Sequence, residues 1–289
     1  MTMMQMNVQG GWPQKTAKSL LGVVIAATVT ACASHGGQRE QAYTARELNE
    51  QLVMSTLWMQ SAAEYQALSY QAFNMAKLRL DQAMKDRKQG DKPLAVVVDC
   101  DETVIDNSAF EAYLVGHDAE YSSALWGQWV NDAQAKALPG ATSFLNYAQR
   151  HGVEVFYITN RKQAELAPTM QNLAQLGFPY VDTRHVMMRT DTSDKQPRRD
   201  QVLQDHNVVL YMGDNLADFD SGYDAPEATT RQQHVKEQQA LFGERFIMLP
   251  NPAYGGWEGA LYEGDYSLSP GEKDQRRKAA LMPWQPANL

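Results

Sequence analysis

The chain has 289 residues, of which 34 are Asp or Glu and 26 are Lys or Arg, so its formal net charge is −8. Apolar residues make up 44% and charged residues 21% of the chain, which excludes a disordered or collagen-like protein. The excess of acidic over basic residues, together with the lack of a long basic run in the sequence, argues against nucleic-acid binding. Two cysteines, Cys32 and Cys100, exclude a disulfide scaffold and a four-cysteine zinc site.

The N-terminal segment has the pattern of an export signal. Lys15 and Lys18 precede an apolar run over residues 20–31, which is too short to span a bilayer and typical of a signal-peptide core. The run ends in Val-Thr-Ala directly before Cys32. This ending resembles a bacterial lipobox, in which the chain is cut before the cysteine and the thiol is acylated. An ordinary secretory signal that is cut elsewhere is the alternative.

We therefore expect a lipoprotein signal peptide over residues 1–31 and a flexible tether over 32–42. A lipid on Cys32 would anchor the protein in the membrane of the bacterial cell envelope. Ser34, rather than an Asp, follows Ala33, which favours the outer membrane by the usual bacterial sorting pattern.

Helices are predicted over residues 43–92. Thr44 and Glu47 have the spacing of a capping box, and apolar residues then recur at steps of three and four. We expect this stretch to break into two helices between residues 55 and 66. The sequence Gly-Asp-Lys-Pro at 90–93 ends it.

Apolar runs that predict buried strands alternate with helical patterns in the rest of the chain. The predicted strands are 94–98, 153–158, 208–212 and 245–249, and the predicted helices are 139–150, 164–176 and 197–205. This alternation indicates an α/β fold with a central parallel sheet. We expect one domain over 43–289, with a core at 93–106 and 139–250, a small helical insertion at 107–138, and a late loop and C-terminal tail at 251–289.

Two carboxylates follow the first predicted strand. Asp99 and Asp101 lie two residues apart at a strand end, where one can act as a nucleophile and the other can deliver and recover a proton. A solvated acidic loop is the plain alternative. A calcium loop is excluded, because its pattern requires Gly where the sequence has Val104.

Polar residues also follow the later predicted strands. Thr159 and Asn160 lead toward a helix and suit a phosphate oxygen, although a simple helix cap explains them equally well. Asp214 and Asp218 offer the hard oxygen ligands that suit Mg²⁺. Lys195 precedes a helix that begins with Pro, and it could reach a phosphoryl group or lie in a solvated loop. Because ligands bind at the carboxyl ends of parallel strands, we expect these side chains to converge.

The combined motifs resemble a known enzyme family. The lipobox, D-x-D-E-T-V-x-D-N from Asp99, Y-I-T-N-R from Tyr157, D-K at Lys195, G-D-N-L-x-D-F around Asp214 and the late N-x-x-Y-G-G-W-E segment from Asn251 are similar to those of the class C acid phosphatases. The bacterial lipoprotein e type is the most similar group. The resemblance implies a Rossmann-like haloacid dehalogenase fold with a helical cap insertion and an N-terminal helical addition.

The resemblance also implies roles for the motif residues. Asp99 would form an aspartyl-phosphate, and Asp101 would act as general acid and base. Mg²⁺ would bind the Asp99 carboxylate, the Asp101 backbone carbonyl and Asp214, with Asp218 orienting a metal-bound water. The phosphoryl oxygens would be held by Thr159, Asn160 and Lys195.

Trp126 and Tyr254 are expected to enclose an aromatic leaving group, such as a nucleoside or nicotinamide. Trp126 could instead pack the insertion onto the sheet. The resemblance thus predicts a magnesium-dependent phosphatase acting on phosphomonoesters, possible substrates being 5′-nucleotides or nicotinamide mononucleotide. A non-catalytic envelope lipoprotein of the same fold and a phosphotransferase of the same superfamily are the alternatives, and a homo-oligomer is possible.

Overall fold

The computed structural model describes residues 42–286. The predicted signal peptide, the lipidation site Cys32 and nearly all of the tether lie outside the described residues. Within 42–286, every helix is too short or too polar to cross a membrane.

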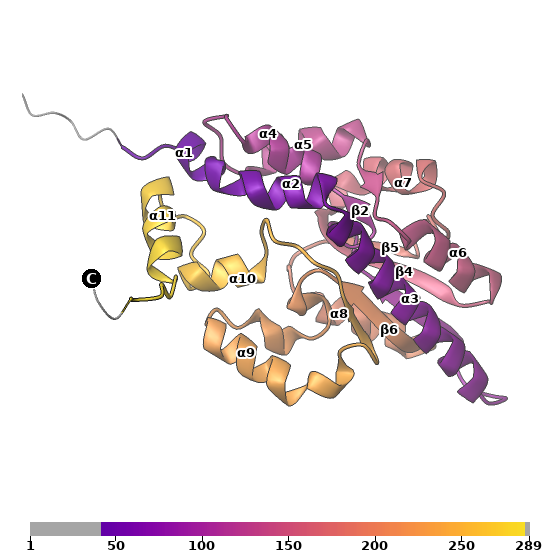
Figure 1. Ribbon diagram of the computed structural model, residues 1–289. Coiled ribbons are helices and arrows are strands. Elements are labelled where there is room, and N and C mark those ends of the chain that lie inside the picture. Colours follow the sequence, from indigo (N-terminus) through magenta and orange to yellow (C-terminus); the bar gives the residue numbers. More distant parts are fainter. Residues whose placement is uncertain (1–41, 287–289) are drawn as a thin grey trace, which may run out of the picture. The chain divides into compact units, whose positions relative to one another are not determined.

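The core is a parallel sheet of five strands in the order β5-β4-β1-β6-β7, as Figure 1 shows in part. This sheet confirms the predicted α/β fold. The strand that the sequence analysis missed is β5, which is short and only alternately buried. The strands are β1 (Leu94–Val98), β4 (Glu154–Lys162), β5 (Val186–Arg189), β6 (Asn207–Gly213) and β7 (Phe246–Met248).

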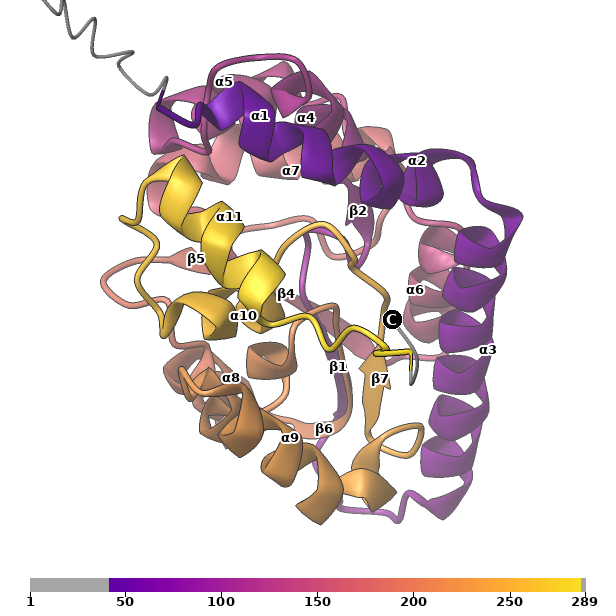
Figure 2. The ribbon, with the colours of Figure 1, turned by 60° about the vertical axis from the view of Figure 1, so that its left-hand side comes forward.

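Helices cover both faces of the sheet, which explains why β1 is apolar at every position. Leu94, Val96 and Val98 belong to the core under α3, α6 and α7, whereas Ala95 and Val97 belong to the core under α8 and α9. Figure 2 shows α3 and α6 on one side of the sheet and α8 and α9 on the other. These helices are α3 (Ala63–Asp86), α6 (Ala141–Arg150), α7 (Leu166–Gln175), α8 (Gln196–Asp205) and α9 (Ala228–Glu237).

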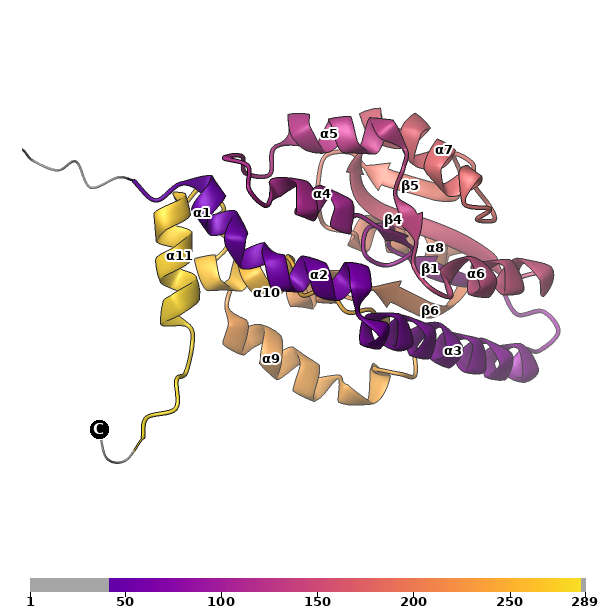
Figure 3. The same cartoon turned by 45° about the horizontal axis from the view of Figure 1, so that its top comes forward.

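The N-terminal helices lie across the sheet and the insertion. The predicted capping box of Thr44 and Glu47 opens α1 (Ala45–Asn49). The predicted break falls at Ala62, whose extended backbone separates α2 (Val53–Ser61) from α3. Figure 3 shows α2 running beside α4 of the insertion, and the two helices are in contact.

Residues 107–138, the expected insertion, contain two helices next to a short antiparallel stem. Strand β2 (Ile105–Asp106) leads into α4 (Ser108–Leu114), and α5 (Ser123–Asp132) returns to β3 (Lys136–Ala137), which pairs with β2. The stem holds both helices next to the end of β1.

Two predicted segments differ from the structure. Strand β4 continues to Lys162 through an irregularity in its pairing with β5, so Thr159 and Asn160 lie in a strand end and not at a helix start. After β6, a 3-10 turn over Leu216–Asp218 carries Asp218. The predicted C-terminal tail contains α10 (Gly256–Gly259) and α11 (Pro270–Ala279), which packs on α1.

Candidate active site

Three of the predicted aspartates meet at the carboxyl ends of the central strands. Asp99, Asp214 and Asp218 are buried, and each offers a carboxylate oxygen within 4.8 Å of the others. The register explains the meeting, because Val98 pairs with Met212 and the Asp99 amide then donates to the Met212 carbonyl at 2.9 Å. We call these three residues the acidic cluster.

Gly213 leaves the space that the Asp218 side chain occupies in the acidic cluster. A Cβ atom at this position would overlap the carboxylate of Asp218. Asp218 Oδ2 instead accepts a hydrogen bond from the Asn215 amide at 2.9 Å, which folds the tight turn after β6 back over the strand end.

Lys195 lies inside the acidic cluster, as the sequence led us to expect. Its Nζ is 2.5 Å from Asp99 Oδ1 and 2.6 Å from Asp218 Oδ1, and its side chain is buried. Burial alone would lower the pKa of Lys195, but the charges of Asp218 and Asp99 outweigh it and raise that pKa above its usual value. The lysine therefore carries a fixed positive charge against the predicted nucleophile.

One lysine does not balance three carboxylates. Burial raises the pKa of Asp99 to about 7 even though Lys195 opposes this shift. Among the residues that the structure describes, Asp214 accepts hydrogen bonds only from neutral groups, Thr103 Oγ1 at 3.2 Å and Asn251 Nδ2 at 2.9 Å. Burial, and then the charges of Asp218 and Asp99, raise the pKa of Asp214 well above its usual value.

This donor set fits a divalent cation. No cationic side chain within 42–286 forms an ion pair with Asp214, although the carboxylate is buried beside two others. Buried oxygen ligands with excess negative charge are the environment that hard cations such as Mg²⁺ prefer. The acidic cluster can therefore hold a metal ion.

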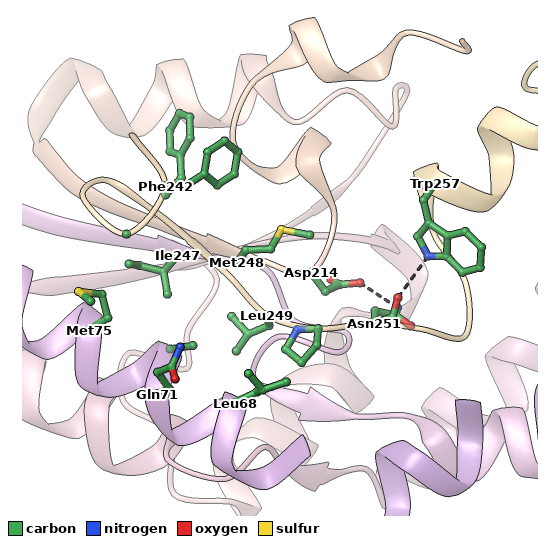
Figure 4. Close-up of a pocket in the computed structure, with 14 residues that line it drawn as sticks. Leu68, Gln71, Met75, Asp214, Phe242, Ile247, Met248, Leu249, Asn251 and Trp257 are labelled. Atoms are coloured by element: carbon green, nitrogen blue, oxygen red, sulfur yellow. Dashed lines mark hydrogen bonds between the residues drawn. The ribbon is translucent and has the colours of Figure 1, made fainter. Parts of the chain in front are cut away.

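An apolar groove of about 430 Å³ ends at the acidic cluster. It runs between α3 and β7, and Asp214 and Asn251 form its polar end (Figure 4). The Trp257 indole donates to the Asn251 carbonyl at 3.2 Å. This hydrogen bond helps to fix the loop that contains Asn251, whose side chain donates to Asp214.

Asp101 lies apart from the acidic cluster. Its carboxylate is paired with Arg161, whose Nη2 is 2.8 Å from Oδ1, and Asn107 Nδ2 donates to the same oxygen at 2.9 Å. Burial alone would lower the pKa of Arg161, but the charge of Asp101 outweighs it and raises that pKa. A metal ion could thus use the Asp101 backbone carbonyl, as predicted, but the carboxylate is engaged elsewhere.

The predicted leaving-group residues are near Asp101. Trp126 is half-buried, packs edge-on against Phe110 at 5.1 Å between ring centroids, and lies over the Arg161 guanidinium at 5.6 Å. Tyr254 donates its hydroxyl to Glu102, a fully buried carboxylate. Trp126 thus packs within the insertion and keeps a smaller part of its surface exposed.

The predicted phosphate ligands Thr159 and Asn160 are tied to α8. Arg198 Nη1 donates to the Thr159 carbonyl at 2.6 Å, and its Nη2 donates to Asn160 Oδ1 at 2.8 Å. The Thr159 hydroxyl accepts a hydrogen bond from the Arg161 amide at 3.1 Å, whereas the Asn160 side chain is exposed. Arg199 has a different place, since it is buried and donates to the carbonyl of Asp218 at 3.0 Å.

Cys100, between the two catalytic candidates, points away from them into the apolar core. Burial, followed by the charges of Asp99 and Asp101, raises the pKa of its thiol. The thiol therefore stays protonated and packs as a small apolar side chain.

Several site residues escaped the sequence analysis. Each lies in one of the motifs that carry the family resemblance, but the residue with which it forms a hydrogen bond in the site lies far away in the sequence. The sequence could therefore mark these residues as members of a motif, but it could not predict their hydrogen-bond partners. These residues are Glu102, Asn107, Arg161 and Asn251, whose distant partners are Tyr254, Arg161, Asp101 and Asp214 respectively.

Comparisons with known proteins agree with this geometry. Residues 16–257 match the family described as HAD superfamily, subfamily IIIB (Acid phosphatase). The chain is 41% identical to the class C acid phosphatase from Bacillus anthracis, with a TM-score of 0.79, covering 82% of this chain and 99% of that one. The tungstate-bound structure of that enzyme has the same identity and coverage and a TM-score of 0.78.

A curated plant relative is more distant. The stem 31 kDa glycoprotein of Glycine max is 27% identical over 126 residues, which cover 41% of this chain and 49% of the relative, so the chain spans about half of its length. The family match covers most of the chain, and the bacterial structure matches over nearly its whole length. The chain therefore belongs to the acid phosphatase family of HAD subfamily IIIB, as a member of the class C acid phosphatases.

Proposed function

We propose that the protein is a magnesium-dependent acid phosphatase that hydrolyses phosphomonoesters through an aspartyl-phosphate on Asp99. The observation that carries this proposal is the contact between buried Asp99 and Lys195 inside a cluster that lacks enough positive charge. Phosphoryl transfer depends mainly on positioning and on neutralising charge, and this cluster is built for both.

The chemistry runs in two steps. An oxygen of Asp99 attacks phosphorus while the bond from phosphorus to the leaving oxygen breaks, and Asp101 gives its proton to that oxygen. A water molecule then loses a proton to Asp101 and attacks phosphorus. The bond to Asp99 breaks, and inorganic phosphate leaves with both residues restored.

Mg²⁺ would be held by the Asp99 carboxylate, the Asp101 carbonyl and Asp214, with Asp218 as a contact to a bound water or to Lys195. The ion supplies neutralising charge for the phosphoryl oxygens and the acidic cluster. Lys195, Thr159 and Asn160 would hold the transferring phosphoryl group. The tungstate-bound relative supports an oxyanion site in this fold.

Substrate choice would come from Trp126 and Tyr254, which flank the Asp101 loop through Arg161 and Glu102. An aromatic leaving group could lie between them, as in 5′-nucleotides or nicotinamide mononucleotide. The N-terminal signal supports a lipid anchor on Cys32 and a place in the bacterial envelope, on the outer membrane by the sorting residue Ser34.

Phosphate release from a panel of phosphomonoesters tests the proposal. The purified chain should release phosphate with Mg²⁺, and EDTA should abolish release reversibly. Asp99→Asn should lower turnover by roughly 10⁴-fold, because an amide cannot form the intermediate.

Asp106→Asn is the matched control for this measurement. Asp106 lies in the same motif, but its carboxylate accepts from the Ser108 amide at 2.8 Å and is outside the acidic cluster. Its variant should keep most of the activity. Equal turnover by Asp99→Asn and the wild type would refute the nucleophile, and product transfer to added alcohols in place of release would indicate a phosphotransferase.

A further inference from the structure

The two carboxylate oxygens of Asp101 have unequal surroundings. Oδ1 accepts three hydrogen bonds, from Arg161 Nη2 at 2.8 Å, Arg161 Nε at 3.0 Å and Asn107 Nδ2 at 2.9 Å. Oδ2 has a single long contact, with Arg161 Nε at 3.3 Å. Since a carboxylate offers about four lone-pair positions over its two oxygens, the positions of Oδ1 are taken up by donors, whereas Oδ2 keeps an open position toward another group.

Arg161 is itself held from several directions. Its side chain is 1% exposed, its Nη1 donates to Thr169 Oγ1 at 3.2 Å on α7, and its Nη2 reaches Asn107 Oδ1 at 3.3 Å. The Trp129 indole donates to the same Asn107 oxygen at 2.8 Å, which fixes the orientation of that amide. A planar guanidinium fixed in this way imposes one orientation on the carboxylate it contacts.

We infer that Arg161 is a positioning residue that aims Oδ2 of Asp101 at the oxygen of the leaving group. This inference rests on the proposed function and adds a residue and an atom to it. As the phosphorus–oxygen bond breaks, its electron pair goes to the leaving oxygen, and the proton on Oδ2 moves to that oxygen. Arg161 contacts Asp101 alone among the reacting groups and takes no part in the transfer.

The position of Trp126 extends this role toward the substrate. The Arg161 guanidinium lies under the Trp126 ring at 5.6 Å. Arg161 therefore contacts both Asp101, the proposed proton donor, and Trp126, the residue expected to contact the leaving group. A leaving group that stacks on Trp126 would thereby meet an acid whose direction is already set.

Leaving groups of different basicity distinguish positioning from a general structural role. Glycerol 2-phosphate releases an alkoxide that needs a proton, whereas p-nitrophenyl phosphate releases a stable phenolate that does not. In the full-length chain with Mg²⁺, Arg161→Lys keeps the charge but loses the planar pair of donors. We expect kcat/KM to fall about tenfold more for glycerol 2-phosphate than for p-nitrophenyl phosphate. Equal losses on both substrates would overturn the inference.

Further variants keep the test decisive. Thr169→Val removes an anchor of Arg161 without touching Asp101, and it should give a smaller loss with the same selectivity. If Arg161→Lys does not fold, an absence of selectivity in Thr169→Val overturns the inference. Arg198→Lys is the matched control, because Arg198 contacts Thr159 and Asn160 and its variant should affect both substrates alike.

Asp101→Asn separates this inference from the proposed function. It should show the largest selective loss on glycerol 2-phosphate. If Asp101→Asn lacks selectivity, the acid assignment itself is wrong. If Asp101→Asn is selective and neither Arg161→Lys nor Thr169→Val is, Asp101 keeps its role and the positioning role of Arg161 is rejected.

Discussion

The two ends of the parallel sheet gather charged residues in opposite ways. At the carboxyl ends, one lysine pairs with two of three clustered carboxylates, and the pKa values of Asp99 and Asp214 are raised. At the amino end of β4, one carboxylate, Glu154, is shared by two histidines. His185 Nε2 is 3.0 Å from Glu154 Oε2, and His206 Nε2 is 3.2 Å from Oε1.

In the amino-end group, Glu154 with His185 and His206, both oxygens of the carboxylate have histidine partners without a ligand. Burial alone would raise the pKa of Glu154, but the hydrogen bonds from the two histidines outweigh it and lower that pKa. The ring of Phe156 packs against both histidines, with centroids 4.9 Å and 5.0 Å away. This group therefore joins β4 to the starts of β5 and β6.

The contrast separates charges that stabilise the fold from charges that serve a ligand. Buried carboxylates with too few partners cost stability, and active sites commonly keep such groups for chemistry. Removing a charge should therefore lower activity at the carboxyl end and stability at the amino end.

Asp214→Asn should produce the largest effect. It removes a carboxylate that has no cationic partner within 42–286, so metal-free protein should be as stable as the wild type or more stable. Activity should fall by roughly 10²–10³-fold through loss of the metal ion. Thermal unfolding with and without Mg²⁺ checks this, because the ion should raise Tm in the wild type and much less in the variant. An equal rise in both would contradict the assigned ligand.

Glu154→Gln should produce the converse result. The amide keeps the shape but cannot serve both histidines as an acceptor, so unfolding free energy should drop by about 1–2 kcal/mol. Urea denaturation measures this loss, and kcat of the folded enzyme should be unchanged. A large fall in kcat with no loss of stability would show that the two ends are not separable.

The stability difference between wild type and Glu154→Gln should depend on pH. Because the folded-state pKa of Glu154 lies below its ordinary value of 4.5, the carboxylate contributes fully above that value. Its contribution is lost as pH falls through the folded-state pKa. Denaturation from about pH 6 to about pH 3 should thus show the two proteins converging on the acid side. A constant difference would mean that the charge of Glu154 is not responsible.

Arg184→Gln should have the smallest effect. Arg184 Nη2 is 3.3 Å from Glu154 Oε2, but its side chain is 61% exposed. Exposed ion pairs contribute little, so the loss should be below about 0.5 kcal/mol and activity should be unchanged. A loss as large as that of Glu154→Gln would indicate that the arginine, and not the histidines, stabilises the glutamate.

The sequence predicted elements whose signals are local. Continuous apolar runs gave β1, β4, β6 and β7, and the capping box of Thr44 and Glu47 gave the first helix. Strand β5 was missed because four residues with alternating burial carry too little pattern. The end of β4 was misplaced because its irregular pairing with β5 depends on a strand that was not foreseen.

The candidate site divides in the same way. Residue types and strand ends indicated Asp99, Lys195, Asp214 and Asp218, because parallel strands bring their carboxyl ends together. The contact of Tyr254 with Glu102 could not be predicted, because only the packing of the late loop brings these residues together. The contact of Arg161 with Asp101 joins the ends of the paired strands β1 and β4, but it depends on the continuation of β4 to Lys162, which was not predicted.

The sequence by itself determined the order of the strands along the chain and the chemical groups at their ends. Tertiary structure alone decided which of those groups lie together, because burial and the neighbouring charges raise the pKa values of Asp99 and Asp214. Asp99 and Asp101 are alike in sequence, yet one lies against Lys195 and the other against Arg161. Only the folded chain gives the two carboxylates these different partners, and the roles proposed for them differ accordingly.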